Sequence, residues 1–454
     1  MKLPHVTLLV NVSKITRNLA IVASQPSPCI SGRVWYSFAK SAAAKLGRRR
    51  QTVGEVIWST RALSLTILNS CTLVLANLRC WSSEYEGFGR VAAKQELLAF
   101  AKLSGGFAIA RRALRKHLRI LAYHGLWTTP GFAFGDRLFM GPDQFKRRIE
   151  WLKRSCYRVL SLDEAVAALA NGTLRDNSVV ITIDDGWKST YTHMLPILEQ
   201  WGLPATVYIT SWYADKQIPV LNVALNYVLQ CSNVDNFTWH SPKHSAMPLR
   251  LGDRKDRQVT ALKLDRMLQE LPTIAERLHE FREICKLADV STEPWWSAGQ
   301  FHLMNREEIR LAYQRGLNIQ LHTHRHGNVD SATGLLAEEL SQNRSYLADA
   351  CGSDQLAHFC YPNGRYDPAA AEVLAGAGIK SAVLTEPGLN PPGANPYALR
   401  RFLDGRSVTQ EEFEAYLCGA LDLYAGVAGR LRPGRLAATA DVGGLRSRGT
   451  RGPL

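Results

Sequence analysis

Short apolar runs alternate with amphipathic segments through the middle of this chain of 454 residues. Each run is rich in Val, Ile, Leu, Ala, Phe or Tyr and is long enough for a strand. The runs cover residues 118–123, 179–183, 205–209, 317–321, 356–361 and 379–384. Between them apolar residues recur at helical spacing, as at Phe145, Ile149 and Leu152. Strands that alternate with helices predict a parallel sheet covered by helices, either a barrel or a doubly wound sheet.

Residues 212–300 interrupt this alternation. Leu264, Leu268 and Leu271 follow i, i+4, i+7 spacing, which is typical of a helix with one buried face. We therefore expect a mostly helical insertion in an α/β domain that spans residues 120–424.

Two of the expected strands end in residues that can carry chemistry. The run 179–183 leads into Asp184 and Asp185, and the run 317–321 leads into a segment with His322 and His326. Adjacent carboxylates resist joint ionisation, so a cation or a shared proton is expected there. Two imidazoles and a carboxylate form a common site for zinc or a similar divalent metal. The alternative is that the aspartates only cap the following helix.

Three segments, in this order, resemble the motifs of the polysaccharide deacetylases, the NodB-homology group similar to carbohydrate esterase family 4. They are Ile-Thr-Ile-Asp-Asp-Gly at 181–186, His-Thr-x-x-His at 322–326 and Tyr-Pro-x-Gly at 361–364. The resemblance extends from about residue 120 to about residue 404. It implies a deformed (β/α) barrel with fewer than eight complete units, which the mostly helical insertion interrupts.

The resemblance also implies roles for the residues of the first two motifs. Asp184 corresponds to the catalytic base, and Asp185, His322 and His326 correspond to the ligands of one divalent metal. Zinc is the expected metal, with cobalt or nickel as alternatives. His324 lies inside the motif at a position that does not bind the metal.

Residues around these motifs are candidates for contact with a substrate. We expect the backbone N–H of Asn363 to stabilise an oxyanion, as a catalytic contact. The candidates for substrate binding are Trp187, Thr323, Tyr361 and Pro362. For Trp187 the alternative is packing in the core, which is the usual place of a tryptophan.

The chain departs from the family pattern in two places. Cys360 stands where the third motif usually has an arginine, and no histidine follows His358, so the late family histidine that acts as general acid is missing. Arg401 resembles a late family arginine, and it is our candidate replacement for the arginine that is missing from the third motif. His124, at the end of the run 118–123, matches a permuted form of the family and is our candidate general acid.

These observations predict an enzyme, a hydrolase of carbon–nitrogen bonds other than peptide bonds. The expected reaction is metal-dependent hydrolysis of the N-acetyl amide of an aminosugar-containing polysaccharide, such as an exopolysaccharide, or of a lipid-linked saccharide. One alternative is a deformylase or deacetylase of another small amide. Another alternative is a catalytically silent barrel that binds carbohydrate, which Cys360 and the missing late histidine would favour.

The net charge of +15 comes from the flanks of the chain. Residues 1–119 hold 19 lysines and arginines against four acidic residues, whereas residues 120–423 hold 30 against 35. A mildly acidic catalytic region argues against a nucleic-acid partner. We expect residues 94–119 to form a basic amphipathic helix that packs on the domain, with peripheral contact to a membrane as the alternative.

The two ends of the chain differ from the middle. Residues 1–93 show no sustained period, and we expect an extension that is not part of the functional protein; residues 425–454 are rich in Gly, Arg and Ala and are expected to be disordered. No secretory signal is recognisable and the nine cysteines are scattered singly, which favours the cytoplasm. A membrane-associated or periplasmic location is the alternative. Nothing in the sequence indicates the oligomeric state.

Overall fold

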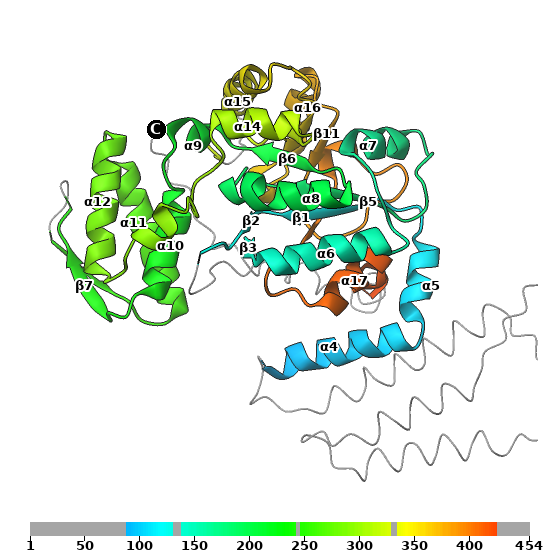
Figure 1. The fold of residues 1–454 in the computed structure, drawn as a ribbon, viewed down its shortest axis with the longest axis horizontal. Coiled ribbons are helices and arrows are strands. Elements are labelled where there is room, and N and C mark those ends of the chain that lie inside the picture. Colours follow the sequence, from blue (N-terminus) through cyan, green and yellow to red (C-terminus); the bar gives the residue numbers. More distant parts are fainter. Residues whose placement is uncertain (1–87, 130–137, 242–245, 328–333, 425–454) are drawn as a thin grey trace, which may run out of the picture. The chain divides into compact units, whose positions relative to one another are not determined.

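The computed structural model describes residues 88–129, 138–241, 246–327 and 334–424, all of which belong to one compact unit, residues 87–454. Figure 1 shows the arrangement of these elements. The expectations for the N-terminal extension, apart from its last residues, and for the tail 425–454 lie outside the described residues. Among the described helices, none combines the length and the apolar character that a membrane crossing requires.

Eight parallel strands form the central sheet (Figure 1), in the order β11-β10-β9-β6-β5-β1-β12 with β4 beside β5. All six runs that the sequence pattern indicated contribute a strand. The strands are β1 Arg119–Tyr123, β4 Arg158–Val159, β5 Ser178–Ile183, β6 Thr206–Ile209, β9 Asn318–Leu321, β10 His358–Cys360, β11 Ser381–Val383 and β12 Phe402–Leu403. A parallel bridge from Val383 to Leu399 links β11 to the segment before β12. The sheet therefore curves into the deformed barrel that the sequence predicted.

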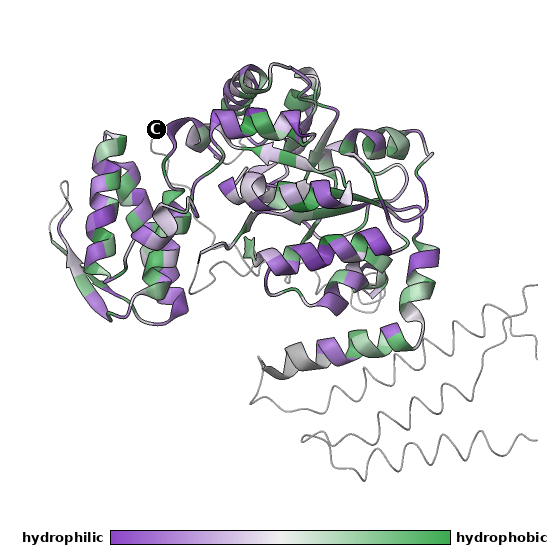
Figure 2. Cartoon of the chain, in the orientation of Figure 1, coloured by the Kyte–Doolittle hydropathy of each residue, from purple (hydrophilic) through white to green (hydrophobic). Residues whose placement is uncertain are grey.

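Most of the helices cover the outside of the sheet (Figure 1), whereas α7 packs on the residues that point into the barrel. On α6, Phe145, Ile149 and Leu152 are fully buried, and in Figure 2 these helices carry both hydrophilic and hydrophobic residues, as expected of helices with one face on a core. The helices are α6 Pro142–Arg154, α7 Leu162–Ala170, α8 Leu195–Trp201, α14 Arg306–Gln314, α15 Leu335–Cys351, α16 Pro368–Gly376 and α17 Gln410–Cys418. Shorter elements between them are β2 Gly125–Leu126, β3 Phe139–Met140, the π-helix η2 Thr190–Met194 and the 3-10 helix η5 Pro396–Ala398.

Side chains alternate strictly between the outside and the inside of the barrel. In β5, Val179, Ile181 and Ile183 pack with the surrounding helices, whereas Val180 belongs to a smaller interior cluster with Tyr208 of β6. Because successive residues of a strand point to opposite faces, the even-numbered residues of β1, β5, β6, β9 and β10 point inward. This alternation decides which polar residues at the strand ends face the interior.

The basic segment before the barrel is broken into two helices, so the expectation of one helix over residues 94–119 is wrong. Helix α4 covers Phe88–Leu103 and α5 covers Gly106–Ala113. Gly105 between them has φ +85°, a left-handed conformation that ends α4, since a helix cannot continue through it. Both helices contact α17, which agrees with packing on the domain.

The insertion is mostly helical, but it also holds a hairpin that the sequence pattern did not reveal. Its elements are α9 Ser211–Lys216, α10 Leu221–Cys231, β7 Asn236–Trp239, β8 Met247–Arg250, α11 Arg254–Gln269, α12 Ile274–Leu287 and α13 Glu293–Trp296. Strands β7 and β8 pair antiparallel, and their four-residue length is too short for a clear alternation signal. Rings of Trp127 and Phe301 pack on Tyr227 of α10 and so join the insertion to the barrel.

Candidate active site

The two adjacent aspartates follow β5 and have different surroundings. Asp184 continues the inward series of Val180 and Thr182 and is 2% exposed. Asp185 has φ +69°, a conformation that costs free energy for a residue with a Cβ. Gly186 follows with φ +84°, where an added Cβ would lie 3.1 Å from Ile209 Cγ1. The tight turn therefore directs the two carboxylates to different partners, one inside the barrel and one at its rim.

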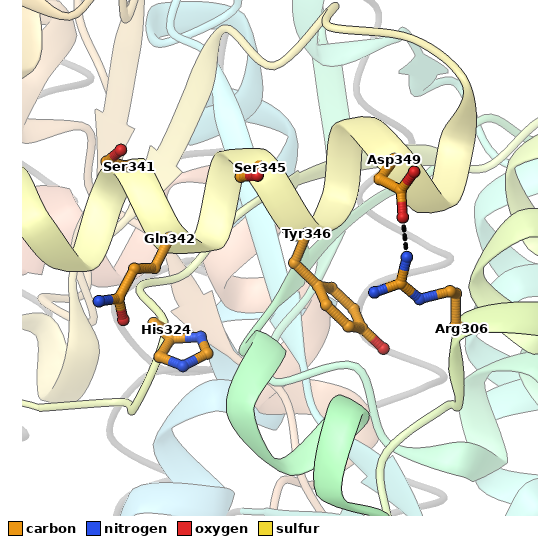
Figure 3. A pocket seen from close by; sticks show the side chains of 7 residues that line it. All are labelled: Arg306, His324, Ser341, Gln342, Ser345, Tyr346 and Asp349. Carbon is orange, nitrogen blue, oxygen red and sulfur yellow. Dashed lines mark ion pairs between the residues drawn. The ribbon is translucent and has the colours of Figure 1, made fainter.

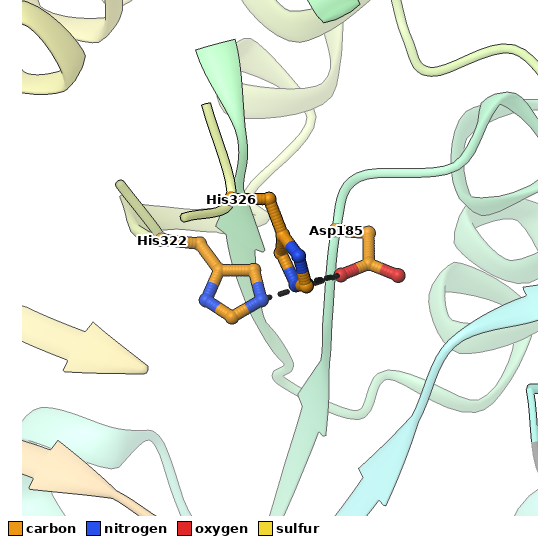
Figure 4. A group of neighbouring side chains, drawn as sticks. All are labelled: Asp185, His322 and His326. Atoms are coloured by element: carbon orange, nitrogen blue, oxygen red, sulfur yellow. Dashed lines mark ion pairs between the residues drawn. The ribbon is translucent and has the colours of Figure 1, made fainter. Parts of the chain in front are cut away.

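Asp185, His322 and His326 form the candidate metal centre (Figure 4). The Nε2 atom of His322 lies 3.2 Å from Oδ1 of Asp185, and the Nε2 atom of His326 lies 3.5 Å from the same oxygen. All three ligand atoms lie within 4.8 Å of one another. Two imidazole nitrogens and one carboxylate oxygen that converge in this way suit zinc and similar ions, with coordination positions left for water and substrate.

Hydrogen bonds fix the other polar atoms of this group. The Nδ1 atom of His322 lies 2.8 Å from the carbonyl oxygen of Cys360, which accepts only from a protonated nitrogen, so in the neutral ring Nε2 keeps the lone pair. The indole N–H of Trp187 donates to Oδ2 of Asp185 at 2.8 Å, which leaves Oδ1 for an ion. Burial and the neighbouring His322 lower the pKa of His326 to about 4. The lowered pKa favours the neutral ring that a metal ligand requires, whereas for His322 burial lowers the pKa but Cys360 and Asp185 outweigh it and raise this pKa well above its usual value.

The loop that carries the two histidines has a strained backbone. Thr323 has φ +64° and His326 has φ +57°, left-handed values that residues with a Cβ adopt only when their surroundings hold them. The hydroxyl of Thr210 donates to the His322 carbonyl at 3.2 Å, and the Trp212 N–H donates to the His324 carbonyl at 2.8 Å. The chain after β6 thus fixes the shape of the loop after β9.

Asn343 on α15 completes this support, and sequence reasoning missed it. Its side chain is fully buried, its Oδ1 accepts from the His322 N–H at 3.0 Å, and its Nδ2 donates to the Ile209 carbonyl at 3.0 Å and to Ser211 Oγ at 2.9 Å. An asparagine on the buried side of a predicted helix was the only available signal, because an apolar residue is the usual occupant of such a position.

Arg401 reaches Asp184 through the interior of the barrel. It is fully buried, and its Nη1 and Nη2 atoms each donate to one oxygen of the Asp184 carboxylate at 2.7 Å. It also donates to the Leu384 carbonyl at 2.7 Å and to the Thr182 hydroxyl at 3.0 Å. Burial alone would raise the pKa of Asp184, but the Arg401 charge outweighs it and lowers this pKa below its usual value. Asp184 is therefore ionised and held in one orientation.

Cys360 stands at the position where the third motif usually has an arginine, a much longer side chain. Its sulfur lies 3.2 Å from Arg401 Nη2 and 3.6 Å from Asp184 Oδ2, so the small thiol leaves room for the guanidinium that comes from the other side of the barrel. Burial raises the pKa of the Cys360 thiol. A protonated, fully buried thiol is a poor nucleophile, so Cys360 has no sign of a catalytic role of its own.

His124 lies beside the same carboxylate. It follows β1 on the inward face, and its Nε2 atom is 3.9 Å from Oδ2 of Asp184. Its side chain is 10% exposed, and Nδ1 is buried without a hydrogen-bond partner among the described residues. His124 therefore stands at the entrance to the interior, next to the candidate base.

The third motif forms a tight turn after β10. The 3-10 helix η4 covers Pro362–Gly364, and Asn363 within it is exposed with φ +56°. Gly364 has φ +66°, and an added Cβ would collide with the backbone and side chain of Thr385, so only glycine fits there. The turn places Asn363 at the same end of the barrel as the two aspartates, because all the strands run parallel.

Four residues that we expected to contact a substrate are buried instead. Trp187 and Thr323 are 1% exposed, Tyr361 is 0% exposed, and Pro362 is also buried. The Trp187 ring packs against Phe139, with 5.0 Å between ring centroids, so it offers no free face to a sugar. Asp184 and His322 are buried to the same degree, so direct contact of these four residues with a substrate stays a prediction. They lie in the turns after β5, β9 and β10, and these turns fold back into the core.

The polar residues brought together here lie where parallel barrels hold their active sites, at the carboxyl ends of the strands. Fold and site together define a barrel hydrolase with a candidate metal centre beside a buried acid. Residues 171–279 and 291–382 match the model of the family described as polysaccharide deacetylase. The chain therefore carries a polysaccharide deacetylase domain, and it is a hydrolase that acts on carbon–nitrogen bonds.

Two relatives of known name share part of the sequence. YxkH of Bacillus subtilis (strain 168), named a polysaccharide deacetylase, is 20% identical over 301 residues, which cover 66% of this chain and 76% of the relative. The poly-beta-1,6-N-acetyl-D-glucosamine N-deacetylase of Escherichia coli (strain K12) is 33% identical over 90 residues, which cover 18% of this chain and 13% of that enzyme.

Solved structures also align with the chain. The Streptococcus pyogenes deacetylase PplD in complex with acetate aligns with a TM-score of 0.43 and 16% identity, over 66% of this chain and 98% of that chain. IcaB from Ammonifex degensii aligns with a TM-score of 0.42 and 18% identity, over 66% of this chain and 97% of that chain.

Proposed function

We propose that this protein removes the acetyl group from N-acetylated aminosugars of a polysaccharide, in a reaction that depends on one divalent metal ion. The observation that carries the proposal is the convergence of two imidazoles on the Asp185 carboxylate, next to a second carboxylate held by Arg401. One carboxylate is arranged to bind an ion and the other to accept a proton, which is the division of labour that amide hydrolysis needs.

Asp185, His322 and His326 would hold the metal ion. Their donor set of two nitrogens and one oxygen favours zinc, and cobalt or nickel also accept it. A divalent ion in this place supplies Lewis acidity to a water molecule and to the oxygen of the amide carbonyl. The chain itself prepares the ligands, because the Cys360 carbonyl and the Trp187 N–H already bind the atoms that the ion does not use.

Asp184 is the proposed general base. The two hydrogen bonds from Arg401 keep its carboxylate ionised at neutral pH and prevent its rotation. An ionised, oriented carboxylate can take a proton from the attacking water. Arg401 is a positioning residue in this scheme, and it replaces the arginine that the third motif lacks.

His124 is the proposed general acid. The leaving amine must receive a proton, because an amide anion is too basic to depart, and an imidazole is well suited to donate one near neutral pH. Its position 3.9 Å from Asp184 supports the proposal, since base and acid must serve the same tetrahedral intermediate. We also propose that the backbone N–H of Asn363, on the exposed turn after β10, contacts the developing oxyanion.

The proposed substrate class is a polymer of N-acetylglucosamine. The Escherichia coli relative is named for its action on the β-1,6-linked polymer, and the match covers a small part of that enzyme, so the linkage in particular requires a test. The experiment measures acetate release from β-1,6-linked and β-1,4-linked N-acetylglucosamine oligomers by the full chain. Metal content is determined in parallel by mass spectrometry, before and after removal of metal with a chelator.

We expect about one equivalent of bound metal, acetate release that stops after chelation, and recovery with zinc, cobalt or nickel. The matched variants are His322→Ala, which should lose metal and activity, and Asp184→Asn, which should keep metal and lose activity by roughly 10²–10⁴-fold. Release of acetate without metal would contradict the role of the metal. Failure of the loaded enzyme to act on any oligomer would contradict the proposed substrate class.

A further inference from the structure

Five basic side chains gather around the N-terminal ends of β1, β4 and β5, at the end of the barrel opposite the candidate active site. All five are exposed. They come from α5, from the turn between α5 and β1, from the start of β4 and from the loop before β5. We call this surface the basic face, and its residues are Arg112, Arg115, Lys116, Arg158 and Arg175.

Hydrogen bonds join the segments that carry these cations. The Asn177 N–H donates to the Arg115 carbonyl at 2.8 Å, and the Arg158 N–H donates to the Asn177 carbonyl at 3.0 Å. A side-chain N–H of Arg115 also donates to the Arg112 carbonyl at 3.1 Å. Segments that are distant in the sequence therefore meet in one continuous basic surface.

The basic face carries more positive charge than its own carboxylates neutralise. Among the described residues, Asp176 alone forms an ion pair with any of these cations: its Oδ2 atom lies 3.3 Å from Arg115 Nε, and its Oδ1 atom lies 3.0 Å from Lys116 Nζ. Elsewhere on the barrel an exposed arginine has a carboxylate of its own, as Arg306 has in Asp349 (Figure 3). Five cations that share one carboxylate leave a clear excess of positive charge.

The ends of helices explain only part of this charge. Cations near the C-terminus of a helix interact favourably with the helix dipole, and Arg112 lies in the last turn of α5. Arg158 begins a strand and Arg175 lies in a loop, so the dipole gives no reason for a cation at either position. A concentration of unneutralised positive charge attracts partners of negative charge.

Two large apolar side chains of the same helical segment are also exposed. Ile109 is 48% exposed and lies one helical turn before Arg112, so the two share one side of α5. Leu103, the last residue of α4, is 80% exposed at the corner that Gly105 makes between the two helices. Basic and exposed apolar side chains on one short segment are typical of helices that lie at a membrane surface.

Charge and apolar character together select the partner. A nucleic acid would match the charge of the basic face, but its phosphate backbone offers no apolar layer to Ile109 and Leu103. It would also extend over residues 120–423, which hold 30 lysines and arginines against 35 acidic residues. A membrane with anionic phospholipids offers negative head groups and, beneath them, an apolar layer for the two side chains.

We propose that the basic face, together with Ile109 and Leu103, docks the protein on the surface of a membrane that contains anionic phospholipids. This inference does not depend on the proposed reaction. The barrel strands are parallel, so the metal centre lies at their opposite ends, beyond the six residues of β5, which span roughly 20 Å. Docking in this way leaves the candidate active site open to substrates in the water.

The test measures how the full chain partitions between buffer and sedimented vesicles. One kind of vesicle contains phosphatidylcholine alone, and the other contains phosphatidylcholine with phosphatidylglycerol. The basic-face variant combines Arg115→Gln with Arg158→Gln, and a separate variant carries Ile109→Gln. Hydrogen exchange of the wild-type protein, with and without vesicles, shows which residues make the contact.

A pair of cations in the insertion provides the matched control. Lys263 and Arg266 are exposed on α11, and the neighbouring Leu262 is 45% exposed. Lys263→Gln combined with Arg266→Gln therefore changes the net charge as much as the basic-face variant does, beside a similar apolar side chain. Exposed ion pairs contribute little to stability, so all the variants should unfold at the temperature of the wild-type protein.

We expect the wild-type protein to bind only the vesicles with phosphatidylglycerol, and to dissociate as the ionic strength rises. The basic-face variant should bind roughly 10–30-fold more weakly, which is about fivefold for each cation removed. Ile109→Gln should bind about threefold to tenfold more weakly, because less apolar surface enters the lipid. The control should bind as the wild-type protein does. Vesicles should slow hydrogen exchange in residues 106–118 and leave α11 unchanged.

Equal binding to both kinds of vesicle would overturn the proposal, and so would an equal loss of binding in the basic-face variant and the control. Duplex DNA and sedimentation velocity test the other occupants of this surface. DNA binding that only the basic-face variant loses, without binding to vesicles, would assign the surface to a nucleic acid and overturn the proposal. A wild-type dimer that only this variant dissociates would overturn it in favour of a second copy of the chain.

Discussion

Asn343 provides the sharpest test of how the site is held. Asn343→Leu keeps the approximate volume of the side chain but removes the side-chain partner of the His322 N–H and of the Ile209 carbonyl, and it leaves the Ser211 hydroxyl with His324 alone. Each unsatisfied buried group costs about 1–3 kcal/mol, and partial rearrangement reduces the sum. We expect the free energy of unfolding to fall by about 3–5 kcal/mol.

A second consequence separates positioning from stability. Because Asn343 fixes the backbone of His322, its loss should let the imidazole move away from Asp185 and weaken zinc binding about 10–100-fold, the usual effect of removing support from a metal ligand. The assay is competition for zinc with a chromogenic chelator, together with denaturant unfolding in the presence of chelator.

The chain offers a closely matched control for this substitution. Asn390 is also a buried asparagine with three hydrogen bonds to the backbone, to the Leu118 carbonyl and to the carbonyl and N–H of Arg400. Asn390→Leu should cost similar stability without a change in zinc affinity, since none of its partners belongs to the metal centre. The reasoning is refuted if Asn343→Leu loses stability as Asn390→Leu does but binds zinc as tightly as the wild-type protein.

Three further predictions concern ionisable side chains. Arg401→Met should lower the free energy of unfolding by roughly 3–5 kcal/mol because it leaves the Asp184 charge unpaired, and adding Asp184→Asn should restore most of the stability but no activity; additive losses would argue against the pairing. His124→Gln should keep bound metal and lower kcat, whereas an unchanged kcat would exclude it as the acid. Asp163→Asn should weaken the bond to buried His358. Because His358 lowers the pKa of Asp163, the stability difference should be present at pH 7 and shrink below about pH 4, measured by urea unfolding.

The sequence determined which residues could meet at the site. The alternation along 179–183 places Asp184 on the same face as Val180 and Thr182. This alternation is a property of one strand, so it can be predicted without knowing which strands lie beside it. The spacing of His322 and His326 likewise limits both imidazoles to one turn of backbone. Capping boxes at Ser161 and Asn305 form in the structure because their partners are three residues away.

The sequence predicted less well which of the aromatic residues are buried and where the short elements lie. A tryptophan at position 187 could be a platform for a sugar ring or a core residue, and the sequence does not distinguish these two roles. In the structure its ring packs against Phe139. The break at Gly105 and the hairpin β7–β8 were missed for a related reason. Glycine is tolerated inside a helix, and short strands give too weak a pattern to register.

Only the tertiary structure decided which distant residues support the candidate centre. Arg401 and Asp184 are 217 residues apart, and they meet because β1 alone separates β12 from β5 in the barrel. Asn343 reaches His322 because α15 packs on β9. Local periodicity specifies which face of an element is buried. It carries no information on which other element covers that face, because strand order and helix packing are chosen by the free energy of the whole core.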